Sequence, residues 1–225
     1  MCGRFGLTTD GERLQLQFGF EWSHTGITWR PRYNIAPTQD VLAVVQKGED
    51  RFGGLLRWGL VPYWAKGLSV GSKNINARAE TVGEKPSFRE ALLKRRCLVI
   101  ANGFYEWRKE PEGGKTPLWI HLASGEPFAF AGLWETWKSP AGERVGSCTI
   151  LTTDSNELIA PIHNRMPVIL NRVGEERWLD PGNRDLVPLF EVLVPHPADG
   201  MAAYPVSPLV NSVANDVPEC IERAA

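Results

Sequence analysis

The second residue of the chain, Cys2, has the clearest chemical potential because of where it stands. A methionine followed by a small residue is normally trimmed in the cell, which would leave Cys2 with a thiol and a free α-amine on adjacent carbons. About 10% of such an amine is neutral at pH 7, against about 0.04% of a lysine amine. An aldehyde would form a Schiff base with this amine, and the thiol would then close a thiazolidine ring. Many chains begin with Met-Cys without using it, so position alone leaves the function open.

A second segment with unusual polarity runs from residue 74 to residue 81. If it forms an extended strand, alternation puts Asn74, Asn76, Arg78 and Glu80 on one face. A strand face made only of polar residues is unusual in a protein core. It fits either a site or a solvated sheet edge.

Glu106 and His163 stand in two further candidate segments. Glu106 lies among aromatic residues in the run Gly103-Phe104-Tyr105-Glu106-Trp107, where partial loss of hydration suits a carboxyl group to proton transfer. His163 begins His163-Asn164-Arg165-Met166-Pro167, and histidine is the commonest proton shuttle near neutral pH. Each also has a structural interpretation, as a salt-bridge partner and as a packed histidine.

The elements that would hold these residues predict an α+β protein. Many short strands separated by Gly and Pro turns, with a few helices between them, favour a single domain over residues 1–225. We expect a twisted, mainly antiparallel sheet that forms a barrel-like core with short flanking helices. Strands are predicted at 41–45, 97–101, 118–121, 128–134 and 149–153, and helices after the capping box 9–12 and at 87–94, 156–162 and 186–192.

Composition narrows the class of protein. The chain has 43% hydrophobic and 23% charged residues, with 25 basic against 26 acidic side chains, as in an ordinary globular protein. This balance neither favours nor excludes nucleic acid, because a local basic groove can lie within a neutral total. The four cysteines are scattered and no metal-ligand spacing occurs, so we expect no metal and no cofactor. We find no signal peptide and no membrane span, and expect a cytoplasmic protein.

Taken in order, the motifs resemble one family, SRAP (SOS response-associated peptidase), whose members crosslink to abasic sites in DNA. Several motifs in a fixed order are far more specific than any one of them, and these cover residues 1–216. They are Met1-Cys2-Gly3-Arg4-Phe5, residues 32–37, 57–62, 75–81, 103–107 and 163–167, and the C-terminal residues 206–207, 210–211 and 215–216.

The resemblance implies a role for each matching residue. Cys2, freed of Met1, would be the nucleophile, and Asn76 would orient the sugar beside it. Glu106 would move protons during ring opening, and His163 would act as acid or base around the Schiff base. The residues implied to bind DNA are Arg4, Asn34, Trp64, Arg78, Trp107 and Arg165, through phosphate contacts and base stacking.

The implied partner is single-stranded DNA that contains an abasic site, including DNA at replication-fork junctions. The implied protein is a monomer, associated with the nucleoid when bound to DNA, and its chemistry is that of a Schiff-base, lyase-like enzyme. Two alternatives remain open. A cysteine-type peptidase that removes its own Met1 would turn over peptide, and a non-covalent single-strand binder would keep its function in Cys2→Ala.

Overall fold

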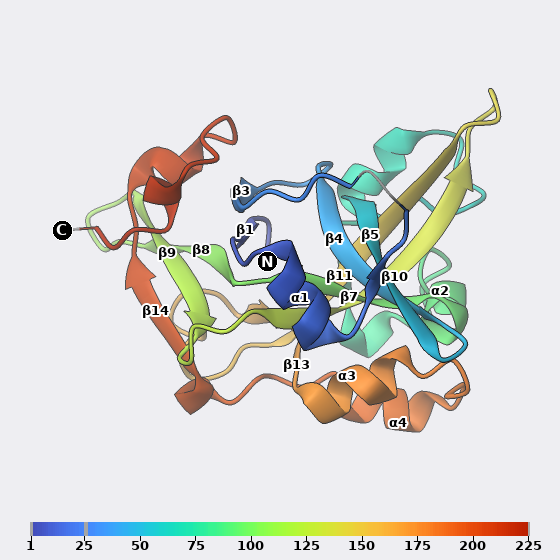
Figure 1. Ribbon diagram of the computed structural model, residues 1–225. Coiled ribbons are helices and arrows are strands. Elements are labelled where there is room, and N and C mark those ends of the chain that lie inside the picture. Colours follow the sequence, from blue (N-terminus) through green and yellow to red (C-terminus); the bar gives the residue numbers. More distant parts are fainter. Residues whose placement is uncertain (1, 25–26, 225) are drawn as a thin grey trace.

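A closed barrel of five strands forms the centre of the computed structural model, which describes residues 2–24 and 27–224 (Figure 1). Its strands are β4 (Asp40–Lys47), β5 (Asp50–Trp58), β7 (Arg96–Ala101), β10 (Phe128–Lys138) and β11 (Arg144–Asp154). Neighbours pair antiparallel in the order β11-β10-β7-β4-β5, and a parallel pairing of β5 with β11 closes the ring. The predicted barrel-like α+β fold is therefore confirmed.

Short strands extend this barrel at its edges. β2 (Glu21–Trp22) pairs with β5, β13 (Ile169–Leu170) with β10, and both β6 (Asn76–Arg78) and β12 (Arg165–Pro167) with β11. The polar segment from residue 74 is extended only over β6 and then turns into a 3-10 helix, Ala79–Thr81. Ala77 and Ala79 are buried and Arg78 and Glu80 are exposed, so the predicted alternation holds over residues 77–80. It does not hold over residues 74–76, where Asn74, Ile75 and Asn76 are all half-buried.

A second, five-stranded sheet packs against the barrel and carries the N-terminus. Its order is β14 (Met201–Pro205), β9 (Lys115–Leu122), β8 (Gly103–Lys109), β1 (Phe5–Leu7) and β3 (Arg32–Ile35). Phe5 in β1 has its ring centroid 5.0 Å from that of Trp58 and 5.8 Å from that of Phe130. One hydrophobic core thus joins both sheets, and it holds the start of the chain in place.

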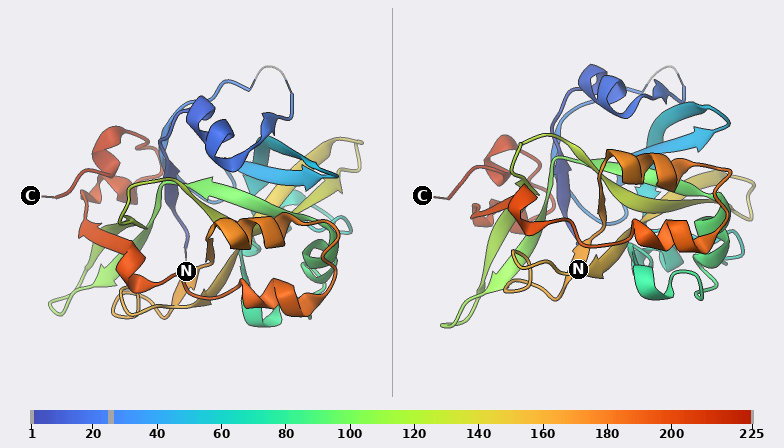
Figure 2. Two further views of the ribbon diagram at one scale, coloured as in Figure 1. Left: turned by 60° about the horizontal axis from the view of Figure 1, so that its bottom comes forward. Right: turned by 90° about the horizontal axis from the view of Figure 1, so that it is seen from below.

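Short α-helices flank the sheets (Figure 2). They are α1 (Gly11–Phe18), α2 (Arg89–Lys94), α3 (Arg172–Leu179) and α4 (Leu186–Glu191). Asp10, and not Thr9, caps α1, since its carboxylate accepts from the Arg13 amide at 2.9 Å. Pro188 is tolerated in α4 because it lies in the first turn, where amides lack helical partners. No helix in the described part of the chain is long and apolar enough to cross a membrane.

The helix predicted over residues 156–162 is wrong, because the chain forms turns there. Asn156 accepts from the amide of Ile159 at 3.0 Å, and its side-chain nitrogen donates to the carbonyl of His196 at 2.7 Å. Pro161 lacks an amide hydrogen, so it cannot extend this turn into a helix. The turn leads directly to His163.

The C-terminal segment, residues 206–223, wraps over the outer face of the second sheet as two 3-10 turns, Pro208–Asn211 and Pro218–Cys220. A second, smaller apolar cluster fixes it there, with Tyr105 and Trp119 of the sheet packed against Val206, Val210 and Cys220. The Tyr105 hydroxyl bonds to the carbonyl of Tyr33 at 2.7 Å.

Helix α3 buries a carboxyl group whose titration should control stability. The side chain of Glu175 is 7% exposed and its nearest cation, Arg172, lies 3.9 Å away. Burial raises the pKa of Glu175 from its ordinary value of 4.5 to about 7. The unfolded chain loses this proton first, so stability falls as pH rises between these two values, by about 3 kcal/mol in total.

We therefore expect Glu175→Gln to stabilise the protein by about 2 kcal/mol at pH 8 and to change little at pH 4.5. Urea unfolding at the two pH values measures this difference. Glu176→Gln is the matched control, because this neighbour is 53% exposed and pairs with Arg51. A gain at pH 8 no larger than that of the control would refute the assignment.

Candidate active site

Cys2 lies fully buried just before β1, within the core shared by the two sheets. Asn76 at the start of β6 donates from Nδ2 to the Cys2 carbonyl at 2.8 Å. The Oδ1 atom of the same amide is buried and has no hydrogen-bond partner among the described residues. A buried acceptor without a donor is costly in a finished fold, so this atom suits a substrate or amine donor beside Cys2.

The surroundings keep the Cys2 thiol protonated. Burial raises its pKa, and the negative charge of Glu106 raises it further. At neutral pH the sulfur is therefore a neutral thiol rather than a thiolate. In a reaction with an aldehyde, such a thiol is poorly suited to attack first, and the α-amine of the same residue is the better first nucleophile.

Glu106 and His163 line one pocket, although 57 positions separate them in the chain. Glu106 comes from β8 and is 6% exposed, whereas His163 follows the turn at 156–162. Glu106 also acts electrostatically on the thiol of Cys2, and Asn76 bonds to the Cys2 carbonyl. His163 joins these residues through the pocket that it shares with Glu106. The pocket has a volume of about 520 Å³ and is lined by Glu106, Trp107, Lys109, Lys115, Ile162, His163 and Asn164.

The tautomer of His163 follows from its backbone contact. Its Nδ1 atom accepts a hydrogen bond from the amide of Arg165 at 2.9 Å. The neutral ring therefore carries its proton on Nε2. In this form Nε2 can donate to an oxygen or nitrogen atom in the pocket.

Arg165, predicted to bind DNA, is 8% exposed and is held by neighbouring oxygens. Its guanidinium forms two bonds to Glu80 at 2.7 and 2.9 Å, one to Asp154 at 2.9 Å and one to the carbonyl of Thr152 at 2.6 Å. These contacts fix the start of β12 and the Arg165 amide that bonds to His163. Arg78, by contrast, is exposed beside this cluster.

Arg4 and Asn34 meet each other and hold the C-terminal segment. Arg4 donates from one nitrogen to Asn34 Oδ1 and to the Val210 carbonyl, both at 2.7 Å, and lies 5.8 Å from the centroid of Trp107. Trp107 Nε1 donates to Asn211 at 2.7 Å. Asn34 is fully buried, so a positioning role fits it better than the predicted direct contact with DNA. Trp64 is 52% exposed and does not line the pocket of Glu106.

Substitution of Asn34 tests how strongly the packing of the C-terminal segment depends on one side-chain amide. Its nitrogen donates to the carbonyls of Val210, Ser212 and Asn215 at 3.2, 3.0 and 2.6 Å. We expect Asn34→Ala to lower the free energy of unfolding by about 2–4 kcal/mol, because buried acceptors lose their donor. Urea unfolding measures the loss. Asn34→Asp should be at least as harmful, since it sets a carboxylate against the same carbonyls, and a tolerated Asp would contradict this explanation.

Sequence reasoning assigned no role to Asp216, which organises the same region. Its carboxylate pairs with Arg32 and accepts from the amides of Tyr33 and Asn34 at 2.5 and 3.0 Å. Lys109, Lys115 and Asn164 in the pocket were missed as well. The turn between β8 and β9 places the two lysines directly across from each other.

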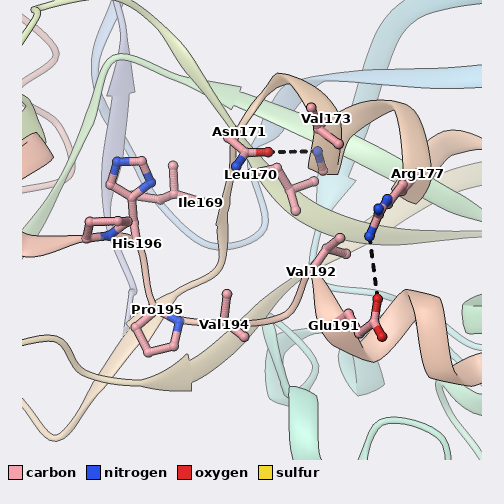
Figure 3. Close-up of a pocket in the computed structure, with 12 residues that line it drawn as sticks. Ile169, Leu170, Asn171, Val173, Arg177, Glu191, Val192, Val194, Pro195 and His196 are labelled. Atoms are coloured by element: carbon pink, nitrogen blue, oxygen red, sulfur yellow. Dashed lines mark hydrogen bonds and ion pairs between the residues drawn. The ribbon is translucent and has the colours of Figure 1, made fainter.

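A separate pocket lies between α3 and the chain after α4 (Figure 3). Asn171 caps α3 through the amide of Gly174 at 2.8 Å, and Arg177 faces Glu191 at 3.5 Å. Burial lowers the pKa of His196 at its rim. None of the predicted site residues lines this pocket.

The buried thiol of Cys2, the amide of Asn76 beside it and the pocket with Glu106 and His163 together form the candidate active site. The chain belongs to the SOS response associated peptidase (SRAP) family, whose sequence model matches residues 1–213.

The known relatives agree along the whole chain. It is 47% identical over 222 residues to the abasic site processing protein YoqW of Bacillus subtilis, covering 99% of both chains. It is 34% identical to the abasic site processing protein HMCES of Gallus gallus, covering 98% of this chain and 77% of that one. A crystal structure of a Bacteroides thetaiotaomicron protein superposes with a TM-score of 0.91 at 28% identity over the full length of both.

Proposed function

We propose that this protein processes abasic sites in single-stranded DNA by joining Cys2 covalently to the opened sugar. The observation that carries the proposal is the surroundings of Cys2, with the unpartnered Oδ1 atom of Asn76 on one side and the charge of Glu106 within reach. The relatives YoqW and HMCES, named as abasic site processing proteins, support the choice of substrate.

The chemistry proceeds in two steps after the loss of Met1. The α-amine of Cys2 adds to the aldehyde carbon of the open-chain sugar, and water leaves to give an imine. The thiol then adds to the imine carbon, its proton passes to the nitrogen, and a five-membered thiazolidine results. One water is released, no electrons are transferred, and no leaving group other than water is needed.

The pocket residues supply the proton transfers that these steps need. The closed sugar must open before it exposes an aldehyde, and Glu106 is placed to move protons in that step. His163, which carries its proton on Nε2, is the donor or acceptor for the departing water and for reversal. Asn76 Oδ1 would accept from the amine or from a sugar hydroxyl, which orients the reacting carbon.

DNA contacts are assigned by exposure. Arg78 is available for a backbone phosphate, and Trp64 for stacking on a base. The guanidinium groups of Arg4 and Arg165 are held by bonds within the protein. Their remaining N–H groups would contact DNA at the edges of the pocket. A single copy of the chain holds all of these groups, so the protein would act as a monomer, and fork junctions remain the expected place of action.

The test is an incubation of protein shown by intact mass to begin at Cys2 with an oligonucleotide that contains one abasic site. We expect a heat-stable species on a denaturing gel whose mass is the sum of both molecules less one water. Undamaged DNA and an abasic site reduced to the alcohol, which lacks an aldehyde, should give none. Absence of this species, with turnover of peptides instead, would favour the peptidase alternative.

A further inference from the structure

Two lysines face each other beside the turn that connects β8 to β9. Lys109 ends β8, Lys115 begins β9, and the two are directly paired across the strands. Both are exposed. Like charges in directly opposed positions destabilise a strand pair, so this arrangement costs stability unless an anion joins it.

The charges of this pair are not matched within the protein. Neither lysine ammonium forms a hydrogen bond or an ion pair with residues 2–24 or 27–224. The nearest acid in the turn, Glu110, is paired with Arg108 at 3.1 Å, and hydrogen bonds from Thr116 and Arg108 lower its pKa. Glu112 is exposed at the tip of the same turn. Two positive charges therefore remain at the pocket.

Both lysines line the pocket that contains Glu106 and His163. Lys109 lies three residues beyond Glu106 on β8, which is roughly 10 Å along an extended strand. A sugar that reacts beside Glu106 would therefore place the backbone of a neighbouring nucleotide, rather than its own ring, against the lysines.

We infer that Lys109 and Lys115 form a subsite for the sugar-phosphate backbone next to the abasic sugar. The inference rests on the proposed function, because it requires the sugar to occupy the pocket. Ammonium groups bind phosphates as point charges and read no base, so the subsite holds the strand independently of sequence. It would raise the local concentration of the damaged strand at Cys2.

A second hairpin provides a matched control. Lys138 and Arg144 are also directly paired, beside the turn that connects β10 to β11. That hairpin projects from the other side of the molecule in Figure 1, and neither residue lines the pocket of Glu106. Removal of either pair changes the net charge equally, so only location distinguishes the two variants.

The experiment compares Lys109→Ala/Lys115→Ala with Lys138→Ala/Arg144→Ala in two assays across a salt series. The first assay is the rate of crosslinking to an abasic oligonucleotide, and the second is the equilibrium binding of the same oligonucleotide with its aldehyde reduced. We expect the first variant to lose about tenfold in both at physiological salt, and its slope of log affinity against log salt to fall by about 1.4. Lys109→Arg/Lys115→Arg should retain both.

Equal rates, affinities and salt slopes in the two Ala variants would overturn the subsite. Failure of the proposed chemistry has a different signature, because wild-type protein would then form no covalent product while the difference in binding and salt slope persisted. An abasic sugar that carries only its own phosphates should react equally with both variants, since it cannot reach the lysines. A defect with this minimal substrate would instead mean that the lysines act on the pocket itself.

Discussion

Cys2→Ser should abolish the heat-stable product while leaving the first chemical step in place. Serine keeps the α-amine, so the imine still forms, but its hydroxyl is a poor substitute for sulfur in closing the ring. We expect heat-stable product below about 1% of the wild-type amount, and an imine that borohydride traps as a stable amine. Denaturing gels run with and without borohydride measure both quantities.

Two outcomes would contradict this scheme. Heat-stable product at the wild-type level would mean that Cys2 is not the ring-closing nucleophile. No trapped product at all would mean that the amine does not attack first, contrary to the inference from the raised pKa of the thiol. Cys97→Ala is the matched control, since Cys97 is equally buried but lies in β7 of the barrel, and it should crosslink normally.

Glu106→Gln should slow crosslinking by about a hundredfold or more, the usual contribution of a positioned acid or base. The amide has the same shape as the carboxyl group but cannot carry the proton that opens the sugar. Single-turnover rates with excess protein measure the effect. Glu135→Gln is the matched control, because Glu135 is 7% exposed in β10 and pairs with Arg95 at 2.8 Å.

A second readout separates proton transfer from structural damage. The charge of Glu106 contributes to the raised pKa of Cys2, so its removal should make the thiol easier to ionise. Alkylation of Cys2 by iodoacetamide should then proceed at least as fast in Glu106→Gln as in wild type. Slower alkylation together with slower crosslinking would indicate a collapsed pocket and would count against the catalytic role.

Much of the fold could be predicted from local patterns. Short apolar runs between turns located the barrel strands β4, β7, β10 and β11, whereas β8, the strand that carries Glu106, was not predicted. The parallel contact of β5 with β11 could not be predicted, because it joins residues about ninety positions apart and depends on how the whole sheet curls. The turns at 156–162 were missed because the spacing of apolar residues there is that of a helix. The hydrogen bond from the Ile159 amide to the Asn156 side chain and the missing amide hydrogen of Pro161 favour turns instead.

For the site, the sequence motifs predicted which residues take part, but not which way their side chains point. The motifs named Cys2, Asn76, Glu106 and His163, and the structure gathers them. The motifs could not show that the Asn34 side chain points inward and donates to three carbonyls. They also could not show that the Arg165 guanidinium donates hydrogen bonds to Glu80 and Asp154. A polar side chain can use the same hydrogen bonds to bind a ligand or to hold a loop of the protein in place. Only the packed structure shows which of these two roles it has.

The bonds from Asn34 to the C-terminal segment span 176 to 181 positions of the chain. During synthesis, the start of the protein therefore leaves the ribosome long before the residues that close over it exist. At about 5–20 residues per second, this interval is about 10–40 s. The N-terminus is open to a trimming enzyme throughout that interval. The order in which the chain is made thus gives a period in which Met1 can be removed before the C-terminal segment exists.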